Sequence, residues 1–170
     1  NALALWKNLY RNKVESWAEC VNVNEKYLTA IKKQYSLQLP QVKIKRIATD
    51  KTVKFLLELS DGNLIESVLM HNKYGMSLCI TSQVGCNMGC SFCASGLLGK
   101  KRDLMVGEFI SQIMVANQYI KKNIASAKVV TNVVIMGIGE PFDNYENFKK
   151  AVTILKEENG LAIASRKITV

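Results

Sequence analysis

The residues with the clearest chemical potential are three closely spaced cysteines, Cys86, Cys90 and Cys93, in the pattern C-x3-C-x2-C. Three thiolates on one short loop can bind three irons of a 4Fe–4S cube and leave the fourth iron without a protein ligand. An open position on a metal is where a substrate or cofactor can bind. Gly85 and Gly89 allow the loop to curl so that the three sulfurs converge. The spacing therefore predicts an open iron–sulfur site.

Two other interpretations of these cysteines stay open. A structural zinc site normally has four ligands, often as two C-x2-C pairs, whereas this chain has one such pair and a single histidine, His71. The cysteines could also be buried thiols that bind no metal. The chain has five cysteines, an odd number, and no visible secretory signal, which favours a reducing cytoplasm over a disulfide framework.

The composition limits the classes of protein that fit. The chain has 170 residues, of which 48% are hydrophobic and 22% charged, which excludes a disordered or collagen-like chain. Its formal net charge of +9 favours a polyanionic partner, RNA or DNA before a membrane surface, although a solvated basic surface explains the charge equally well. The longest uncharged stretch, 74–99, is too rich in polar residues and glycine for a membrane helix, so we expect no membrane span.

Hydrophobic periodicity predicts three parts that position the cysteines. Residues 1–40 show helical spacing and predict a small N-terminal helical accessory domain. Residues 41–75 alternate around an Asp61-Gly62 turn, which predicts a short antiparallel β element. Residues 76–170 alternate between strand and helix, which predicts an α/β fold with a parallel sheet and active-site loops at its C-terminal strand ends. The expected elements are strands near 77–81, 129–136 and 166–170, and helices near 106–120 and 143–160.

A second candidate site is the turn Gly137-Ile138-Gly139-Glu140-Pro141, which follows the buried strand at 129–136. Its glycines allow close backbone approach. Asp143 is placed to cap the next helix, with Glu146 at the capping-box position. The basic run 100–102 follows the cysteine loop and would either contact RNA phosphates or be a solvated helix start.

The cysteine spacing resembles that of radical S-adenosylmethionine enzymes, with Phe92 before the last cysteine and the loop directly after the first strand of a βα run. In that superfamily the unique iron chelates the cofactor, and an electron from the cluster cleaves its sulfonium to give a 5′-deoxyadenosyl radical. The resemblance implies that Cys86, Cys90 and Cys93 bind a 4Fe–4S cluster. It also implies that S-adenosyl-L-methionine is bound by Phe92, Gly137, Gly139, Glu140 and Pro141, with Glu140 accepting from the cofactor's ammonium group.

Longer runs are similar to the RlmN/Cfr family of radical-SAM RNA adenine methyltransferases: residues 78–94, 65–68 and 136–145, the last reading MGIGEPFDNY. The resemblance implies a partial radical-SAM (βα) barrel that methylates carbon 2 of an adenosine in 23S rRNA and also in tRNA. An electron donor such as flavodoxin or ferredoxin is implied too. The alternatives are a Cfr-like carbon 8 methyltransferase, and a non-catalytic iron–sulfur or zinc RNA-binding module.

The same resemblance assigns roles to two residues upstream of the cluster loop. Cys79 would resolve a covalent enzyme–RNA intermediate, unless it is a small core residue, and Glu66 would lie near the target base, unless it is an outward-facing strand residue. The family carries its methyl group on a second cysteine near the C-terminus, but no cysteine follows Cys93 here. Because the chain also ends within a strand-like run at Val170, we expect it to be a fragment of a longer enzyme, inactive by itself.

Overall fold

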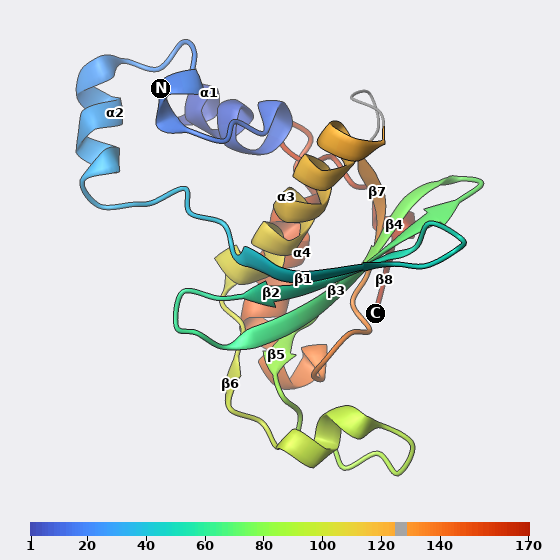
Figure 1. Ribbon diagram of the computed structural model, residues 1–170. Coiled ribbons are helices and arrows are strands. Elements are labelled where there is room, and N and C mark those ends of the chain that lie inside the picture. Colours follow the sequence, from blue (N-terminus) through green and yellow to red (C-terminus); the bar gives the residue numbers. More distant parts are fainter. Residues whose placement is uncertain (125–128) are drawn as a thin grey trace.

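The computed structural model describes residues 1–124 and 129–170, and a six-stranded sheet lies at its centre (Figure 1). The strand order is β1-β2-β3-β4-β7-β8, with antiparallel pairing from β1 to β4 and parallel pairing from β4 through β7 to β8. A separate two-stranded ladder joins β5 to β6. The strands are β1 Gln41–Ile47, β2 Val53–Glu58, β3 Leu64–Asn72, β4 Gly75–Cys79, β5 Gln83–Val84, β6 Arg102–Asp103, β7 Val130–Val134 and β8 Ile168–Thr169.

Two helices, α3 (Val106–Asn123) and α4 (Tyr145–Lys156), pack on one face of this sheet (Figure 1). Their apolar side chains meet alternate residues of the strands, as on β2, where Phe55 is 1% exposed while its neighbour Lys54 is exposed. The order β4, α3, β7, α4, β8 confirms the predicted alternation of strands and helices. In the part of the chain that the structure describes, no helix is both long and apolar enough to cross a membrane.

The antiparallel strands continue the parallel ones in one sheet. β3 pairs with β4 from Val68 opposite Cys79 to Asn72 opposite Gly75, so the segment 41–75 extends the sheet. Alternation in the sequence identifies the buried face of each strand but does not identify the strand's next neighbour, which is why the sequence predicted a separate element. The division of the chain into three domains stays a prediction.

The N-terminal segment is helical in pieces and stands beside α3 at the blue end of the ribbon in Figure 1. Asn24 caps the longest piece by accepting a hydrogen bond from the Lys26 N–H at 3.0 Å. The buried side chain of Asn8 donates to the carbonyls of Ala4 and Val21, which ties the first helix to the following loop. The pieces are α1 Ala2–Trp6, a π-helical stretch Lys7–Asn12, a 3-10 turn Trp17–Glu19 and α2 Glu25–Lys32.

A buried amide, that of Gln112 on α3, anchors the helix to the end of β4. Its Oε1 accepts hydrogen bonds from the Ser67 hydroxyl at 2.8 Å and from the Thr81 N–H at 2.9 Å, and its Nε2 donates to the Thr81 carbonyl at 3.0 Å. Gln112 is 1% exposed, so these bonds replace water around Thr81, where the chain leaves β4. The amide therefore fixes the point from which the cysteine loop departs.

We predict that Gln112→Leu lowers the free energy of unfolding by about 3 kcal/mol, because it leaves the buried N–H and C=O of Thr81 without that partner. Urea denaturation of the chain measures the difference. Gln118→Leu on the half-exposed side of the same helix is the matched control, with an expected change within about 0.5 kcal/mol. Equal stability of the two variants would contradict the anchoring role.

Candidate functional site

The cysteine loop, residues 85–99, begins after β5 and returns into β6, at the lower end of the molecule in Figure 1. The Lys101 N–H donates to the Val84 carbonyl at 2.7 Å and closes the base of the loop. Gly85 has φ +77°, and a Cβ there would lie 1.7 Å from the carbonyl oxygen of Gly99. A residue with a side chain therefore cannot occupy position 85 without opening the base of the loop.

The three loop cysteines differ in exposure: Cys86 is 8% exposed, whereas Cys90 and Cys93 are exposed. The Cys93 N–H donates to the Cys90 carbonyl at 3.0 Å, so these two lie on one tight turn. Hydrogen bonds from the Ser95 side chain and backbone hold the pKa of Cys93 below the usual thiol value. Among residues 1–124 and 129–170, no three His, Cys, Asp or Glu side chains lie close enough to hold a metal ion.

Convergence of the three sulfurs thus stays a prediction, but their chemistry fits an iron–sulfur cluster. Thiolates are the ligands that such clusters take, and the positive φ of Gly85 and Gly89, +77° and +65°, gives the loop the curl that three converging ligands need. His71, which a four-ligand zinc site could use, pairs with Met76 at the start of β4, at the opposite end of that strand from the loop. The donor set therefore fits three thiolates and an open position better than a closed zinc site.

The Gly137–Pro141 turn leaves the end of β7 and packs against residues 80–83. The Gly137 N–H donates to the Ile80 carbonyl at 3.0 Å, and a Cβ at Gly137 would lie 2.7 Å from that oxygen. At Gly139, φ is +98° and a Cβ would lie 2.6 Å from the Cβ of Gln83. The segment that lies close against these two glycines is therefore residues 80–83 of the same chain. Whether the turn also binds a cofactor, as the resemblance implies, stays a prediction.

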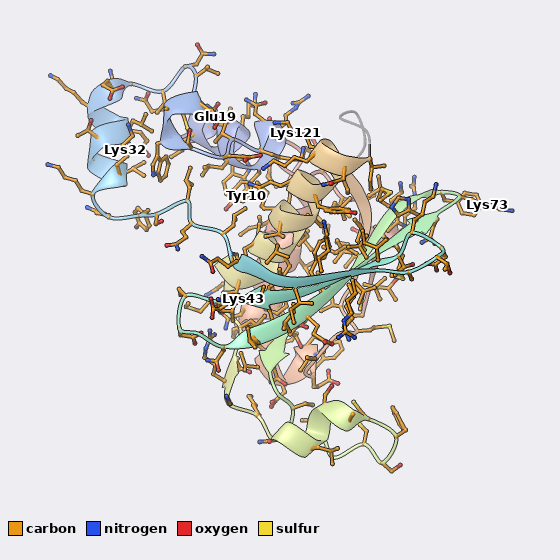
Figure 2. The ribbon with its side chains drawn as sticks, viewed as in Figure 1. Tyr10, Glu19, Lys32, Lys43, Lys73 and Lys121 are labelled. Atoms are coloured by element: carbon orange, nitrogen blue, oxygen red, sulfur yellow. The ribbon has the colours of Figure 1, made fainter. Side chains whose placement is uncertain are left out.

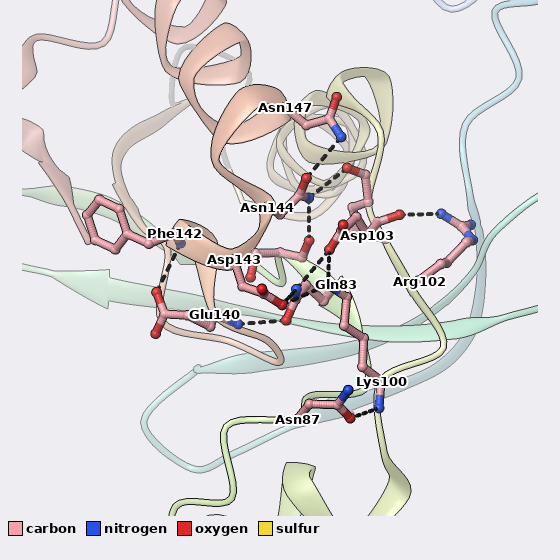
Figure 3. A network of polar contacts seen from close by, with 12 residues as sticks. Gln83, Asn87, Lys100, Arg102, Asp103, Glu140, Phe142, Asp143, Asn144 and Asn147 are labelled. Atoms are coloured by element: carbon pink, nitrogen blue, oxygen red, sulfur yellow. Dashed lines mark hydrogen bonds and ion pairs between the residues drawn. The ribbon is translucent and has the colours of Figure 1, made fainter.

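Glu140 has a structural partner within this turn. Its Oε1 accepts a hydrogen bond from the Phe142 N–H at 3.0 Å and thereby caps a 3-10 helix, Pro141–Asn144. Its own N–H donates to Oε1 of Gln83 at 2.9 Å (Figure 3). The side chain is partly exposed, and its role toward an ammonium group stays a prediction. Phe92, also predicted to bind cofactor, is 91% exposed on the cysteine loop.

A polar network joins the turn to the base of the cysteine loop (Figure 3). The wholly buried Gln83 donates from Nε2 to Asp103 and to Asp143, both at 2.8 Å. Lys100 Nζ lies 2.9 Å from the Asp103 carboxylate and 2.7 Å from that of Asp143. The ammonium group of Lys100 and the amide of Gln83 hold the pKa of Asp143 below its usual value, and the two carboxylates raise the pKa of Lys100.

This network corrects two expectations from the sequence. Asp143 does not cap α4: the N-cap is Asn144, and the Asp143 carboxylate is turned to Lys100 and Gln83. Of the run 100–102, Lys100 and Arg102 are bound within the protein, since Arg102 forms ion pairs with Asp61 at 2.7 Å and Glu108 at 2.8 Å, whereas Lys101 is exposed. Local spacing could not identify Asp61 as a partner of Arg102 or Asp143 as a partner of Lys100, because each pair is about 40 residues apart in sequence.

Cys79 and Glu66 lie on the same face of the sheet, opposite α3. On β3, Ser67 contacts Gln112 of α3, so the alternate residues Glu66 and Val68 face the other way. Val68 is directly opposite Cys79, which makes Cys79 and Glu66 diagonal neighbours, about 7–8 Å apart between Cα atoms in typical sheets.

The side chains of Cys79 and Glu66 are both partly exposed on this face. Burial raises the pKa of the Cys79 thiol, so it is more fully protonated at neutral pH than an exposed thiol. The Glu66 carboxylate pairs with Lys54 at 2.8 Å. The structure thus brings these two predicted residues together, while their catalytic roles stay predictions.

Basic side chains are spread over several elements. Figure 2 labels Lys32 on α2, Lys43 on β1, Lys73 between β3 and β4, and Lys121 near the end of α3. Lys43 is paired with Glu58 at 2.8 Å. The positive charge is therefore distributed over the molecule, in agreement with either the polyanion or the solvated-surface interpretation.

The sequence did not point to an aromatic cluster beside the turn. Phe142 is 62% exposed, and its ring centroid lies 6.4 Å from that of Tyr145 and 5.6 Å from that of Phe148. The sequence analysis also assigned no role to Gln83. Its position in an uncharged stretch, directly before the cysteine loop, is a signal from which a buried polar role could have been predicted.

Comparison with solved structures identifies the class of fold. The chain matches a radical SAM methyltransferase from Sphaerobacter thermophilus with a TM-score of 0.88 and 32% sequence identity, over 98% of this chain and 48% of that chain. The chain therefore has the α/β fold of the matched part of a radical SAM methyltransferase, as the family resemblance implied. A comparison with protein-family models gives no match.

Sequence relatives narrow the class further. Proteins of Exiguobacterium sibiricum, Shouchella clausii and Acholeplasma laidlawii, each described as a probable dual-specificity RNA methyltransferase RlmN, are 47%, 48% and 49% identical to the chain. The matches cover 99%, 99% and 98% of this chain. The chain is a homologue of the RlmN proteins and spans about half, 47%, of the length of each of these three.

We predict that Gly139→Ala lowers the free energy of unfolding by about 2 kcal/mol or more, because position 139 needs a positive φ and the new Cβ would strike Gln83. Gly107→Ala is the control, since a Cβ there meets no atom within 4 Å. That change, in the first turn of α3, should be neutral or stabilising by up to about 1 kcal/mol. Chemical denaturation compares the two, and equal effects would contradict the packing of the turn.

We predict that iodoacetamide modifies Cys79 more slowly than the exposed Cys90 in the folded chain at neutral pH, because Cys79 is half-buried and its pKa is raised. The rate at Cys79 should rise with pH until the pH exceeds that raised pKa. Peptide mass spectrometry measures both rates. In urea the difference should disappear, and equal rates in the folded chain would disprove the burial of the thiol.

Proposed function

We propose that the chain is part of a radical-SAM enzyme that methylates carbon 2 of an adenosine in 23S rRNA and in tRNA. The observation that carries this proposal is the junction of the three-cysteine loop with the Gly137–Pro141 turn, beyond the ends of the neighbouring parallel strands β4 and β7. The identity of 47% with proteins described as RNA methyltransferases supports it. These relatives bear the RlmN name, which favours carbon 2 over the Cfr-like carbon 8 alternative.

In this function Cys86, Cys90 and Cys93 hold a 4Fe–4S cluster, which when bound supplies the electron that cleaves the sulfonium of S-adenosyl-L-methionine. The turn residues Gly137, Gly139, Glu140 and Pro141 bind the methionine end of that cofactor, and Phe92 contributes an aromatic surface. Glu140 is suited to an ammonium group because a carboxylate capped by one N–H has further lone pairs to offer.

The face that carries Cys79 and Glu66 receives the RNA base. Glu66 accepts a hydrogen bond from the base, and Lys54 holds its carboxylate at 2.8 Å. The Cys79 thiol keeps its proton at neutral pH until a base removes it, because burial raises its pKa. The thiolate then attacks the sulfur of the methyl-carrying second cysteine that the family resemblance implies, which is not among the residues of this chain. The S–S bond forms as the bond between that sulfur and the RNA-bound carbon breaks, and the carbon leaves with the electron pair and takes up a proton. A flavodoxin or ferredoxin in the cytoplasm supplies the electrons.

Anaerobic reconstitution with iron and sulfide tests the class of site. We expect the reduced chain to show the EPR signal of a 4Fe–4S cluster, and this signal to change when S-adenosyl-L-methionine is added, because one iron has no protein ligand. Cys90→Ala, which removes one ligand, should lose most of the signal, whereas Cys20→Ala outside the loop should keep it. A colourless chain that binds zinc would contradict the proposal and support an RNA-binding module.

A further inference from the structure

The polar network between the two candidate loops connects them, but its residues have no individual role in the function proposed above. We call Gln83, Lys100, Asp103 and Asp143 the Gln83 junction (Figure 3). Its members come from β5, the residue after the cysteine loop, β6 and the 3-10 helix before α4. Residues that lie far apart in sequence thus meet where the cysteine loop and the turn are adjacent.

Both polar atoms of the Gln83 amide are hydrogen-bonded, and both of its donors are used. Both donors of Nε2 are occupied, by Asp103 and Asp143 at 2.8 Å, and Oε1 accepts from the Glu140 N–H at 2.9 Å. The residue is wholly buried, so water cannot replace a bond that is lost. Gly139 also packs directly against the Gln83 side chain and so restricts its conformation.

Lys100 supplies the charge that the junction needs. Two carboxylates drawn to one neutral amide would repel each other, and the Lys100 ammonium lies within 2.9 Å of both. The backbone N–H of Lys100 donates to Oδ1 of Asn87 at 2.8 Å, and Asn87 is the residue after Cys86. A continuous series of contacts therefore runs from the first cysteine of the loop, through Lys100 and Asp143, to the turn.

We propose that Gln83, Lys100 and Asp143 are positioning residues that hold the cysteine loop in a fixed place relative to the Gly137–Pro141 turn. The identity of the ligand rests on the proposed function: S-adenosyl-L-methionine is to bind an iron on the loop at one end and the turn beside it. Because the junction holds both segments in place before the ligand binds, binding does not have to order two loops. The affinity for the ligand is therefore higher. The junction itself can be tested without any ligand.

The first test measures amide hydrogen exchange in the chain without iron or cofactor. Lys100→Met should speed exchange about fivefold or more in both 85–99 and 137–144, because each loses its tie to the other, while β2 and α3 stay unchanged. Lys101→Met is the matched control: it removes the same charge one residue further on, where Nζ contacts Asn63 at 3.4 Å, and should change exchange less than about twofold. Unchanged exchange, or a change confined to the cysteine loop, would overturn the proposal.

The second test uses the reconstituted chain and measures iron content and binding of S-adenosyl-L-methionine by the EPR change. Lys100→Met and Asp143→Asn should keep the iron content, since the three cysteines remain, but bind the cofactor about tenfold more weakly. The double variant should be no weaker than either single one, because both break the same contact, and Lys100→Arg should restore binding. Wild-type affinity in both single variants would overturn the positioning role. A wild-type chain that holds a cluster but ignores the cofactor would count against the proposed function, and hydrogen exchange would then decide the junction by itself.

Discussion

The parallel pairing of β4 with β7 is the interaction on which the candidate site depends. The ladder continues past the strands, because the Ile80 N–H donates to Val134 at 2.8 Å, and the Gly137 N–H donates back to Ile80 at 3.0 Å. Two segments that leave parallel strands at the same edge of a sheet must run side by side. The cysteine loop and the glycine turn are therefore neighbours from their first residues, and the glycines let the two backbones approach closely.

The cost of this arrangement is an irregular buried segment, 80–83, whose backbone groups lie largely outside regular strand pairing. Backbone groups of Val134, Gly137 and Ile138 pair with part of this segment, and polar side chains from elsewhere in the fold satisfy further groups. Gln112 of α3 binds both backbone groups of Thr81, and Asn144 donates to the Ser82 carbonyl at 2.9 Å. Because buried backbone groups need partners, the amides in the core gather beside the candidate site. Stability and candidate chemistry thus depend on the same few residues.

The same strand end also separates the two sides of the sheet. Toward α3 the side chains form the apolar core, whereas Cys79 and Glu66 lie on the opposite face, next to the segment that leads into the cysteine loop. The cysteine loop, the Gly137–Pro141 turn and the neighbouring Cys79 and Glu66 are thereby gathered at one end of the sheet. This is the arrangement that the proposed function requires, in which cofactor and RNA base would have to meet.

Features that depend on local spacing could be predicted from the amino-acid sequence. The C-x3-C-x2-C loop, its glycines, the Asp61-Gly62 turn and the order of strands and helices all follow from residues close together in the chain. Similarity of sequence is also extensive, with 47% identity to a relative over 99% of this chain.

Contacts between residues far apart in the chain became known from the folded structure. It turned Asp143 from an expected helix cap into a partner of Lys100 and Gln83, and it paired Arg102 with Asp61 and Glu108 instead of leaving it free for phosphate. It also joined the antiparallel strands to the parallel ones. The physical reason is the same in each case: the partner of a polar group or of a strand edge is set by the packing of the whole chain, and hydrophobic periodicity carries no information about it.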